Sequence, residues 1–334
     1  MIEINSISFS LTEEKSILDC LKKVGIVIIR SALKKDDINL YFSISRNFRA
    51  YLLQQTEQTS CHDQDKDYRS IVLKILRMQS GYSLSYQMQY YFDIPNKFYL
   101  PFFLVQKAGL LKMISQYLHG PAGILTNYCS LRVQNPGEVQ KALPFHQDAG
   151  PVNSSNGRGI VIWIPLNEID AVTPTLEIVP QKINHIFPHV GQKETGYSIL
   201  DDESNSIIKN YEGRLIFDNL QQGDVLLFDF TTLHRTYVTK KMTKARYSID
   251  MRCVLPQDLP KYYQGDYLIS KNVADSLNFS FEAELQYVVD KITAFEMAMK
   301  EGFMKVNDQL VECHSLIKKT SMLHWLRNQI RNIF

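Results

Sequence analysis

The chain has 334 residues, 45% of them hydrophobic, and a formal net charge of +2. This length can bury a large core, and so small a charge gives no reason to expect nucleic acid as a partner. Five scattered cysteines form no C-x-x-C pair, which excludes a zinc knuckle or a disulfide framework as the organising feature. With no secretory signal and no long apolar run, we expect a cytoplasmic protein.

The first part of the chain is predicted to be mostly helical. Thr12–Lys23 places its apolar side chains on one side, as an amphipathic helix does. Gly25 is expected to end this helix, and the apolar run Ile26–Ile29 is typical of a buried strand. Helical spacing returns in two further segments, Ser31–Gln55 and Leu104–Leu118.

From Ile124 onward, β-branched and aromatic residues are separated by Pro, Gly, Asn and Asp. Several short strands with turn signals between them indicate an antiparallel barrel or jelly roll. An insert of about 30 residues separates two of the strands, and segments of that length are often lids or binding loops. The predicted strands are Ile124–Gln134, Gly159–Leu166, Thr175–Val179, Asp224–Phe230 and Arg246–Leu255, and the insert is about Lys182–Glu212.

The last part of the chain is predicted to be helical again, in Phe279–Lys300 and Leu316–Phe334. The second of these helices combines an apolar side with several basic residues. That composition suits contact with an anionic membrane surface, and it equally suits packing on the barrel or on a second subunit of a homodimer. We favour packing, and we divide the chain into a β-rich domain, residues 1–255, and a helical C-terminal extension, residues 256–334.

The most informative pattern is His146-Gln147-Asp148. Residues i and i+2 of a strand share a face, so this pair places an imidazole and a carboxylate side by side. Iron(II) enzymes that activate O₂ hold the metal with two histidines and one carboxylate and leave the opposite side open. A lone H-x-D pair also occurs as a solvated turn, or as an aspartate that only orients a histidine.

His234 can supply the second histidine, although a histidine after a buried strand can also be a satisfied core residue. In the strand that follows, alternation places four polar residues on one face. Buried charge needs a partner, and a dicarboxylate co-substrate would provide one to a guanidinium. An outward polar face or an internal Arg–Asp pair is the alternative. The four residues are Arg246, Ser248, Asp250 and Arg252.

The order H-x-D, a distant His, then R-x-S about a dozen residues later resembles the iron(II)/2-oxoglutarate-dependent oxygenases. The sequence between these motifs resembles the phytanoyl-CoA dioxygenase-like branch, whose members have the motif W-x-P-L and, later in the chain, L-x-x-x-P-G-S-H. Trp163–Leu166 matches the first of these motifs, and Leu176–Pro180 matches the start of the second. The Gly-Ser-His that follows is replaced by Gln181–His185. The likeness covers about residues 12–255.

This resemblance implies a mainly β chain with flanking helices and a double-stranded β-helix core, of the jelly-roll or cupin-like kind, followed by the C-terminal helical extension. His146, Asp148 and His234 would bind Fe(II) and form the catalytic centre. Arg246, with Ser248, would hold the distal carboxylate of 2-oxoglutarate. The family also uses a polar side chain on the strand before H-x-D, and Gln134 is the candidate for that cofactor contact.

The implied activity is that of an Fe(II)/2-oxoglutarate-dependent dioxygenase. It would hydroxylate a small molecule, such as a natural product, a lipid or a saccharide, using O₂ and releasing succinate and CO₂. Asp148 favours hydroxylation, because related halogenases have a small residue there, although desaturation and ring closure can use the same triad. Two alternatives stay open: a non-catalytic jelly-roll binding protein, and a cupin-like metal enzyme that does not use 2-oxoglutarate.

Overall fold

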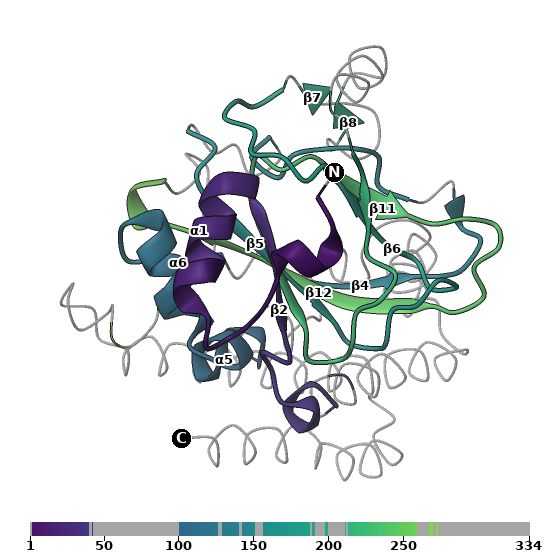
Figure 1. Ribbon diagram of the computed structural model, residues 1–334, viewed down its shortest axis with the longest axis horizontal. Coiled ribbons are helices and arrows are strands. Elements are labelled where there is room, and N and C mark those ends of the chain that lie inside the picture. Colours follow the sequence, from purple (N-terminus) through teal and green to yellow (C-terminus); the bar gives the residue numbers. More distant parts are fainter. Residues whose placement is uncertain are drawn as a thin grey trace, which may run out of the picture.

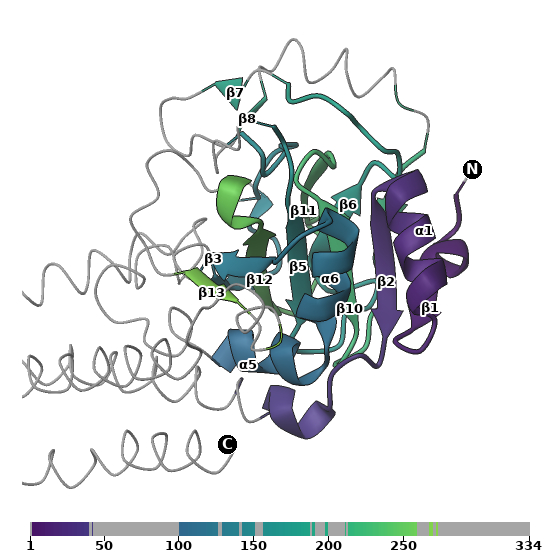
Figure 2. The ribbon, with the colours of Figure 1, turned by 90° about the vertical axis from the view of Figure 1, so that its left-hand side faces the viewer.

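Two β-sheets lie against each other, and helices cover the outer face of the larger sheet (Figures 1 and 2). They belong to a computed structural model of the chain. The residues that the structure describes are 2–39, 42, 100–125, 129–139, 142–150, 156–187, 189–190, 198–199, 211, 213–258, 267–269 and 272.

The larger sheet has eight strands in the order β1-β2-β10-β5-β12-β3-β13, with β4 paired to β12. Its pairs are antiparallel except for β1 with β2. The strands are β1 (Ser8–Ser10), β2 (Ile26–Arg30), β3 (Gly123–Leu125), β4 (Ser130–Gln134), β5 (Ile160–Pro165), β10 (Val225–Asp229), β12 (Arg246–Val254) and β13 (Tyr267–Ile269).

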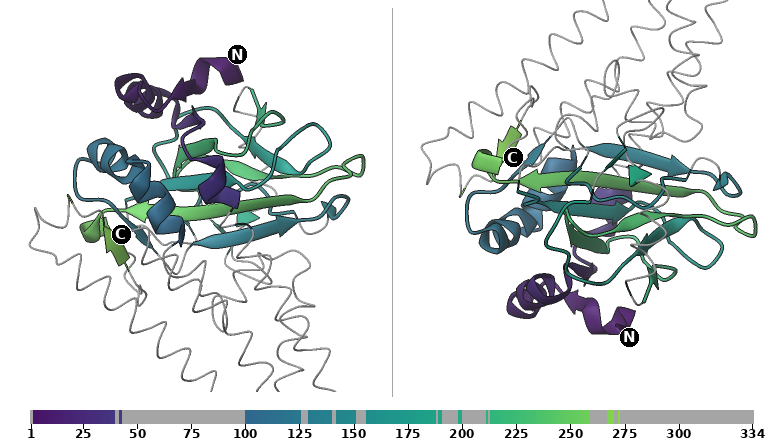
Figure 3. Two further views of the ribbon diagram at one scale, coloured as in Figure 1. Left: turned by 90° about the horizontal axis from the view of Figure 1, so that it is seen from below. Right: turned by 90° about the horizontal axis from the view of Figure 1, so that it is seen from above.

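The smaller sheet has the order β11-β6-β9, and two further short strands, β7 and β8, form a separate antiparallel pair. Figure 3 shows from below and from above how the long green strand β12 runs across the molecule. The strands of these two small sheets are β6 (Thr175–Ile178), β9 (Leu215–Ile216), β11 (His234–Tyr237), β7 (His189–Val190) and β8 (Ser198–Ile199).

Strands β2, β5 and β10 of the larger sheet are apolar except for Arg30 and Asp229 at the ends of β2 and β10, because both of their faces are buried. Alternate residues of β5 point to opposite sides. Ile160 and Ile162 join the cluster under the helices, whereas Val161 and Trp163 pack toward the smaller sheet. The cluster between the sheets also contains Leu176, Ile178, Leu215, Leu226 and Phe228.

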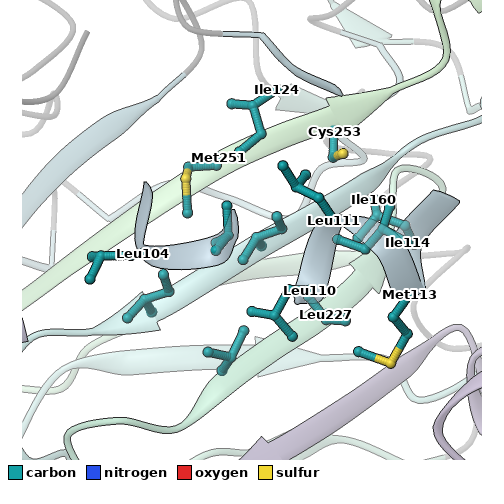
Figure 4. Packing of buried hydrophobic residues seen from close by; sticks show 14 of the residues in the cluster. Leu104, Leu110, Leu111, Met113, Ile114, Ile124, Ile160, Leu227, Met251 and Cys253 are labelled. Carbon is teal, nitrogen blue, oxygen red and sulfur yellow. The ribbon is translucent and has the colours of Figure 1, made fainter. Parts of the chain in front are cut away.

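Helices α1 (Glu14–Val24) and α6 (Leu110–Leu118) cover the outer face of the larger sheet, and α5 (Leu100–Lys107) precedes α6. Figure 4 shows side chains of α6 meeting Ile160, Leu227, Met251 and Cys253 of the strands. The helical spacing predicted over Leu104–Leu118 corresponds to two helices, α5 and α6. Gly109 lies in the left-handed region, at φ +74°, and separates α5 from α6.

Most of the predicted strands are present within a residue or two of their expected bounds. Two details differ. The segment predicted as one strand, Ile124–Gln134, forms the two strands β3 and β4. His234, expected just past a strand, instead begins β11, which pairs with β6. This strand was missed because its four residues, HRTY, carry no apolar alternation.

Along the chain from β4, the strands alternate between the two sheets. After β4 comes His146, which bridges to β11 of the smaller sheet; then come β5, the pair β6 and β9, β10, β11 and finally β12. This is the connectivity of a double-stranded β-helix. The cavity described below lies between the two sheets.

Several predicted segments lie outside the described residues: most of Ser31–Gln55, much of the insert, and both C-terminal helices. Residues 35–39 are helical, as expected for the start of the first of these. β13 joins the larger sheet although it follows residue 255, and the division of the chain at that residue stays a prediction. In the part of the chain that is described, no helix combines the length and apolar character needed to cross a bilayer.

Candidate metal centre

Backbone pairing brings His146 and His234 together. The two residues form an antiparallel bridge, with His146 N donating to His234 O at 3.0 Å and His234 N donating to His146 O at 3.1 Å. Directly opposite residues of an antiparallel pair project their side chains to the same face. The imidazole centroids are accordingly 4.1 Å apart, and both side chains are buried.

Each imidazole is oriented by a carbonyl two residues earlier in the chain. Nδ1 of His146 lies 2.8 Å from Pro144 O, and Nδ1 of His234 lies 3.0 Å from Thr232 O. A carbonyl can only accept, so we assign the proton of each ring to Nδ1, which places the lone pair of each ring on Nε2. Metal-binding histidines are commonly fixed in this way through the nitrogen that does not bind the metal.

Asp148 completes the group, and its carboxylate is fully buried. Oδ1 accepts a hydrogen bond from Arg252 Nη2 at 3.0 Å and lies 3.9 Å from His146 Nε2. Oδ2 is buried with no hydrogen-bond partner. One ligand atom from each of the three residues lies within 4.8 Å of the others. A buried carboxylate oxygen without a partner is costly, and a metal ion on this face would remove that cost.

The local electrostatics keep these groups in the form that a metal needs. Burial lowers the pKa of His146 well below its usual value and also lowers that of His234, so both rings are neutral near pH 7. Burial alone would raise the pKa of Asp148, but Arg252 and the two neighbouring imidazoles together outweigh burial and hold the pKa well below its usual range. Two neutral imidazoles and one carboxylate therefore meet on one face, which fits a facial iron site.

The same cavity contains Arg246, as the sequence predicted. Its side chain is only 2% exposed, its Nη1 donates to Thr175 O at 3.0 Å, and its guanidinium lies 5.8 Å from the Trp163 ring centroid. Its Nε and the Ser248 hydroxyl are both buried without a hydrogen-bond partner. Burial lowers the pKa of Arg246 to about 10, so it remains a cation at neutral pH.

Gln134 lies opposite Arg246 in the β4–β12 register. Its amide nitrogen is 3.4 Å from Asn135 O and 3.3 Å from Glu138 O, so the side chain contacts the turn after β4. It is not among the residues that line the cavity. A role for Gln134 in holding a cofactor stays a prediction.

Sequence reasoning did not single out Arg132, which faces the cavity from β4. Its Nε donates to both carboxylate oxygens of Asp250, at 2.9 and 3.0 Å, and Asp250 also pairs with Arg252. A buried chain of charges therefore runs from Arg132 through Asp250 and Arg252 to Asp148. The internal Arg–Asp pair that was the alternative for the polar face of β12 is present between Arg252 and Asp250. Arg246 lies on the same face and pairs with no carboxylate among the described residues.

Gln147, between the two metal-binding candidates of H-x-D, holds the start of the insert. Its Nε2 donates to His185 O at 2.9 Å and to Thr231 O at 2.7 Å, and its Oε1 accepts from Phe187 N at 2.7 Å. Thr231 Oγ1 donates to Ile183 O at 2.6 Å. Gln147 and Thr231 therefore hold residues 183–187 next to the H-x-D segment. These contacts are made with the backbone of the segment and not with the side chain of His185.

No family model matches the chain, and no curated protein is similar to it in sequence. Solved structures can be aligned with most of its length, and those given below have TM-scores under 0.5. Among the neighbours are enzymes described as non-heme and alpha-ketoglutarate-dependent.

Three of these neighbours illustrate the likeness. The non-heme monooxygenase ThoJ is 12% identical, with a TM-score of 0.48, covering 84% of this chain and 99% of its own. The epimerase SnoN, in complex with Fe³⁺, alpha-ketoglutarate and nogalamycin RO, is 11% identical, with a TM-score of 0.45 and coverages of 73% and 84%. EctD from S. alaskensis, with 2-oxoglutarate and 5-hydroxyectoine, is 10% identical, with a TM-score of 0.47 and coverages of 72% and 76%. Because these TM-scores lie below 0.5, the chemical role of the site follows only from the residues that form it.

Proposed function

We propose that this protein is an Fe(II)/2-oxoglutarate-dependent oxygenase. One observation carries the proposal: two imidazoles and a carboxylate converge in the same cavity as Arg246, which pairs with no carboxylate among the described residues and whose Nε is buried without a partner there. The three ligand residues fit Fe(II). The buried Nε of Arg246 and hydroxyl of Ser248 fit a carboxylate that approaches from the metal side.

The bound iron would supply oxygen activation, coupled to oxidation of 2-oxoglutarate to succinate and CO₂. The side chains of this protein do the remaining work. His146 and His234 present Nε2, because their Nδ1 atoms are held by backbone carbonyls. Asp148 presents Oδ2, because Arg252 holds its other oxygen. Three ligands leave the opposite side of the metal open for the co-substrate and O₂.

From β12, Arg246 and Ser248 would bind the distal carboxylate of 2-oxoglutarate. Both lie on the inward face of β12, two residues apart, so their side chains point the same way. Arg246 is held by Thr175 O through Nη1, which leaves its other nitrogens for the ligand. A guanidinium fixed in advance loses little conformational entropy on binding, so its contribution to affinity is larger.

The substrate is proposed to be a small molecule that is hydroxylated. Asp148 supports hydroxylation because it fills the third ligand position and leaves no space there for a halide. A binding protein without activity is the weaker alternative, since it has no need for a buried carboxylate oxygen without a partner. A metal enzyme that does not use 2-oxoglutarate leaves the orphaned Arg246 and Ser248 unexplained.

The proposal is tested without a substrate. Fe(II) and 2-oxoglutarate are added to the metal-free protein under anaerobic conditions, and the weak visible metal-to-ligand charge-transfer band is recorded. We expect a band that saturates with 2-oxoglutarate. A folded protein that binds Fe(II) but shows no band would favour the metal enzyme that does not use 2-oxoglutarate. A folded protein that binds neither would favour the binding protein.

Matched variants separate the two halves of the site. His146→Ala should abolish the band by losing Fe(II), whereas His119→Ala, at the exposed end of α6, should keep it. Arg246→Gln should keep Fe(II) binding and weaken 2-oxoglutarate binding by at least ten-fold. Ser248→Ala should weaken it by roughly five-fold, the effect of about 1 kcal/mol for one hydrogen bond. Arg235→Gln, on the outward face of β11, should change neither.

A further inference from the structure

Arg132 has a guanidinium that is held by one edge only. Its Nε donates to both oxygens of Asp250, whereas its Nη1 and Nη2 make no hydrogen bond with any residue that the structure describes. The side chain lines the cavity that contains the metal centre. It is 16% exposed, compared with 5% for the side chain of Arg252. The free edge is therefore reachable from the cavity.

The position of this edge is fixed by the ion pairs behind it. Asp250 accepts from Arg132 on one side and from Arg252 on the other, and Arg252 in turn holds Asp148. The guanidinium of Arg132 is thus connected to Asp148, a metal-binding candidate, through three ion pairs in series. A cation held in this way offers two parallel N–H donors, the geometry that suits a carboxylate or a phosphate.

Arg132 and Arg246 reach the cavity from different strands. Arg132 lies on β4, opposite Ser248 of β12, and β4 pairs only with β12 among the described strands. Arg246, on β12, donates instead to Thr175 O of the smaller sheet. Arg246 and Ser248 lie two residues apart on one face of β12, and the Arg246 Nε and the Ser248 hydroxyl are both buried without a partner among the described residues. One dicarboxylate that chelates the metal and pairs with Arg246 has no third carboxylate for Arg132.

The charge balance of the cavity leads to the same conclusion. Its lining contains three guanidinium groups, Arg132, Arg246 and Arg252, and two carboxylates, Asp148 and Asp250, while its two histidines would bind a metal as neutral rings. A divalent metal and a 2-oxoglutarate dianion add equal and opposite charges. One positive charge then stays unmatched in a buried site, where unpaired charge is costly.

We propose that Arg132 binds an anionic group of the substrate, a carboxylate or a phosphate, next to the metal centre. The inference rests on the proposed function, because it assigns Arg132 to the substrate and Arg246 to the co-substrate. It makes the substrate an acid or a phosphate ester whose oxidised carbon lies within a few bonds of the anionic group.

The test uses protein loaded with Co(II), which occupies the site without turnover, and saturating 2-oxoglutarate. Inorganic phosphate, benzoate and the neutral benzamide are titrated by calorimetry. We expect at least one anion to bind, with benzamide at least ten-fold weaker than benzoate if the group is a carboxylate. Tighter phosphate binding indicates a phosphate ester. Arg132→Gln should weaken anion binding at least ten-fold, and Arg132→Lys should restore part of it.

Arg235→Gln removes a guanidinium from the outward face of β11 and should leave anion binding unchanged. The inference is overturned if the wild type binds neither anion, if Arg132→Gln binds them as the wild type does, or if that variant loses 2-oxoglutarate affinity to the same extent. Co(II) and 2-oxoglutarate affinities are measured separately. Their failure in the wild type contradicts the proposed function, and the anion titrations without 2-oxoglutarate still report on Arg132.

Discussion

The contact between Arg252 and Asp148 has two opposite consequences for metal binding. A guanidinium 3.0 Å from a ligand carboxylate repels a metal cation, which weakens binding. The same contact fixes the carboxylate so that Oδ2 points to the open face, which strengthens binding. Asp148 is fully buried, and without Arg252 its Oδ1 would lose its hydrogen bond. We therefore expect the orienting effect to dominate.

Arg252→Met should weaken Co(II) binding by roughly 10- to 100-fold, the range found when partners that orient metal ligands are removed. Calorimetric titration of the metal-free protein measures this affinity, and circular dichroism confirms that the variant folds. Arg252→Lys keeps the charge and should recover part of the affinity. Arg235→Met serves as the control outside the cavity. Tighter Co(II) binding by Arg252→Met would show that repulsion dominates instead.

The candidate metal-binding residues could be named from sequence because of their spacing. Arg246 and Ser248 share a face of β12, whereas Asp148 lies in the turn that follows the bridge residue His146. The ion pairs around them could not be predicted. They depend on the register that places Arg132 of β4 opposite Ser248 of β12, and a shift of one residue would turn Arg132 away from the cavity.

Among the structural elements, the insert depends most on a single side chain. Gln147 makes three hydrogen bonds with backbone groups of the insert and of the β10–β11 connection, and it is completely buried. Because Gln147 lies between His146 and Asp148, the H-x-D segment and the start of the insert are linked through one side chain.

Gln147→Leu keeps the volume of the side chain and removes all three hydrogen bonds. The amide of Phe187 then loses its acceptor, and its hydrogen exchange should accelerate by at least ten-fold. Mass spectrometry of a peptide covering residues 183–187 measures this rate. Gln222→Leu removes a glutamine that donates to a backbone carbonyl elsewhere, and it should leave that peptide unchanged. Unchanged exchange in Gln147→Leu would show that other contacts hold the insert.

The junction between α1 and β2 depends on Gly25. This residue has φ +83° and closes the helix by donating to Leu21 O. A Cβ here would lie 3.2 Å from Asp229 Oδ2 and 3.3 Å from Thr232 Oγ1. Gly109 has a similar φ of +74°, but a Cβ there meets nothing within 4 Å. The two glycines therefore share the backbone strain and differ in crowding.

Gly109→Ala should lower the free energy of unfolding by about 1 kcal/mol, the cost of left-handed backbone in alanine. Gly25→Ala should lower it by about 2–3 kcal/mol, because crowding adds to that strain. Urea denaturation of both variants measures the difference. Equal losses would show that Asp229 and Thr232 adjust without cost.

The elements that sequence reasoning described well are those with a strong local pattern. The apolar runs of β2, β5 and β10 and the amphipathic α1 lie where they were expected. The missed elements lack such a pattern. β11 reads HRTY, and it is a strand because β6 pairs with it through four residue positions. The break at Gly109 was hidden because apolar residues continue at helical spacing on both sides of it.

At the scale of the whole molecule, the site joins the two sheets. The metal face is built from the His146–Asp148 segment and β11, on the side of the smaller sheet, whereas Arg246 and Ser248 belong to β12 of the larger sheet. A metal and a dicarboxylate that bind here contact both sheets at once. Such ligands bind the folded chain and not the unfolded one, so they stabilise the fold by mass action.

Thermal unfolding should therefore show an ordered dependence on the two ligands. Co(II) alone should raise Tm, 2-oxoglutarate alone should have little effect because it lacks the metal it chelates, and both together should raise Tm most. At a hundred times its dissociation constant, a ligand adds about 2.7 kcal/mol. His146→Ala should remove both increments, and Arg246→Gln should remove only the second. If 2-oxoglutarate raises Tm equally with and without Co(II), it binds away from the metal, and the assignment of Arg246 and the triad to one site is wrong.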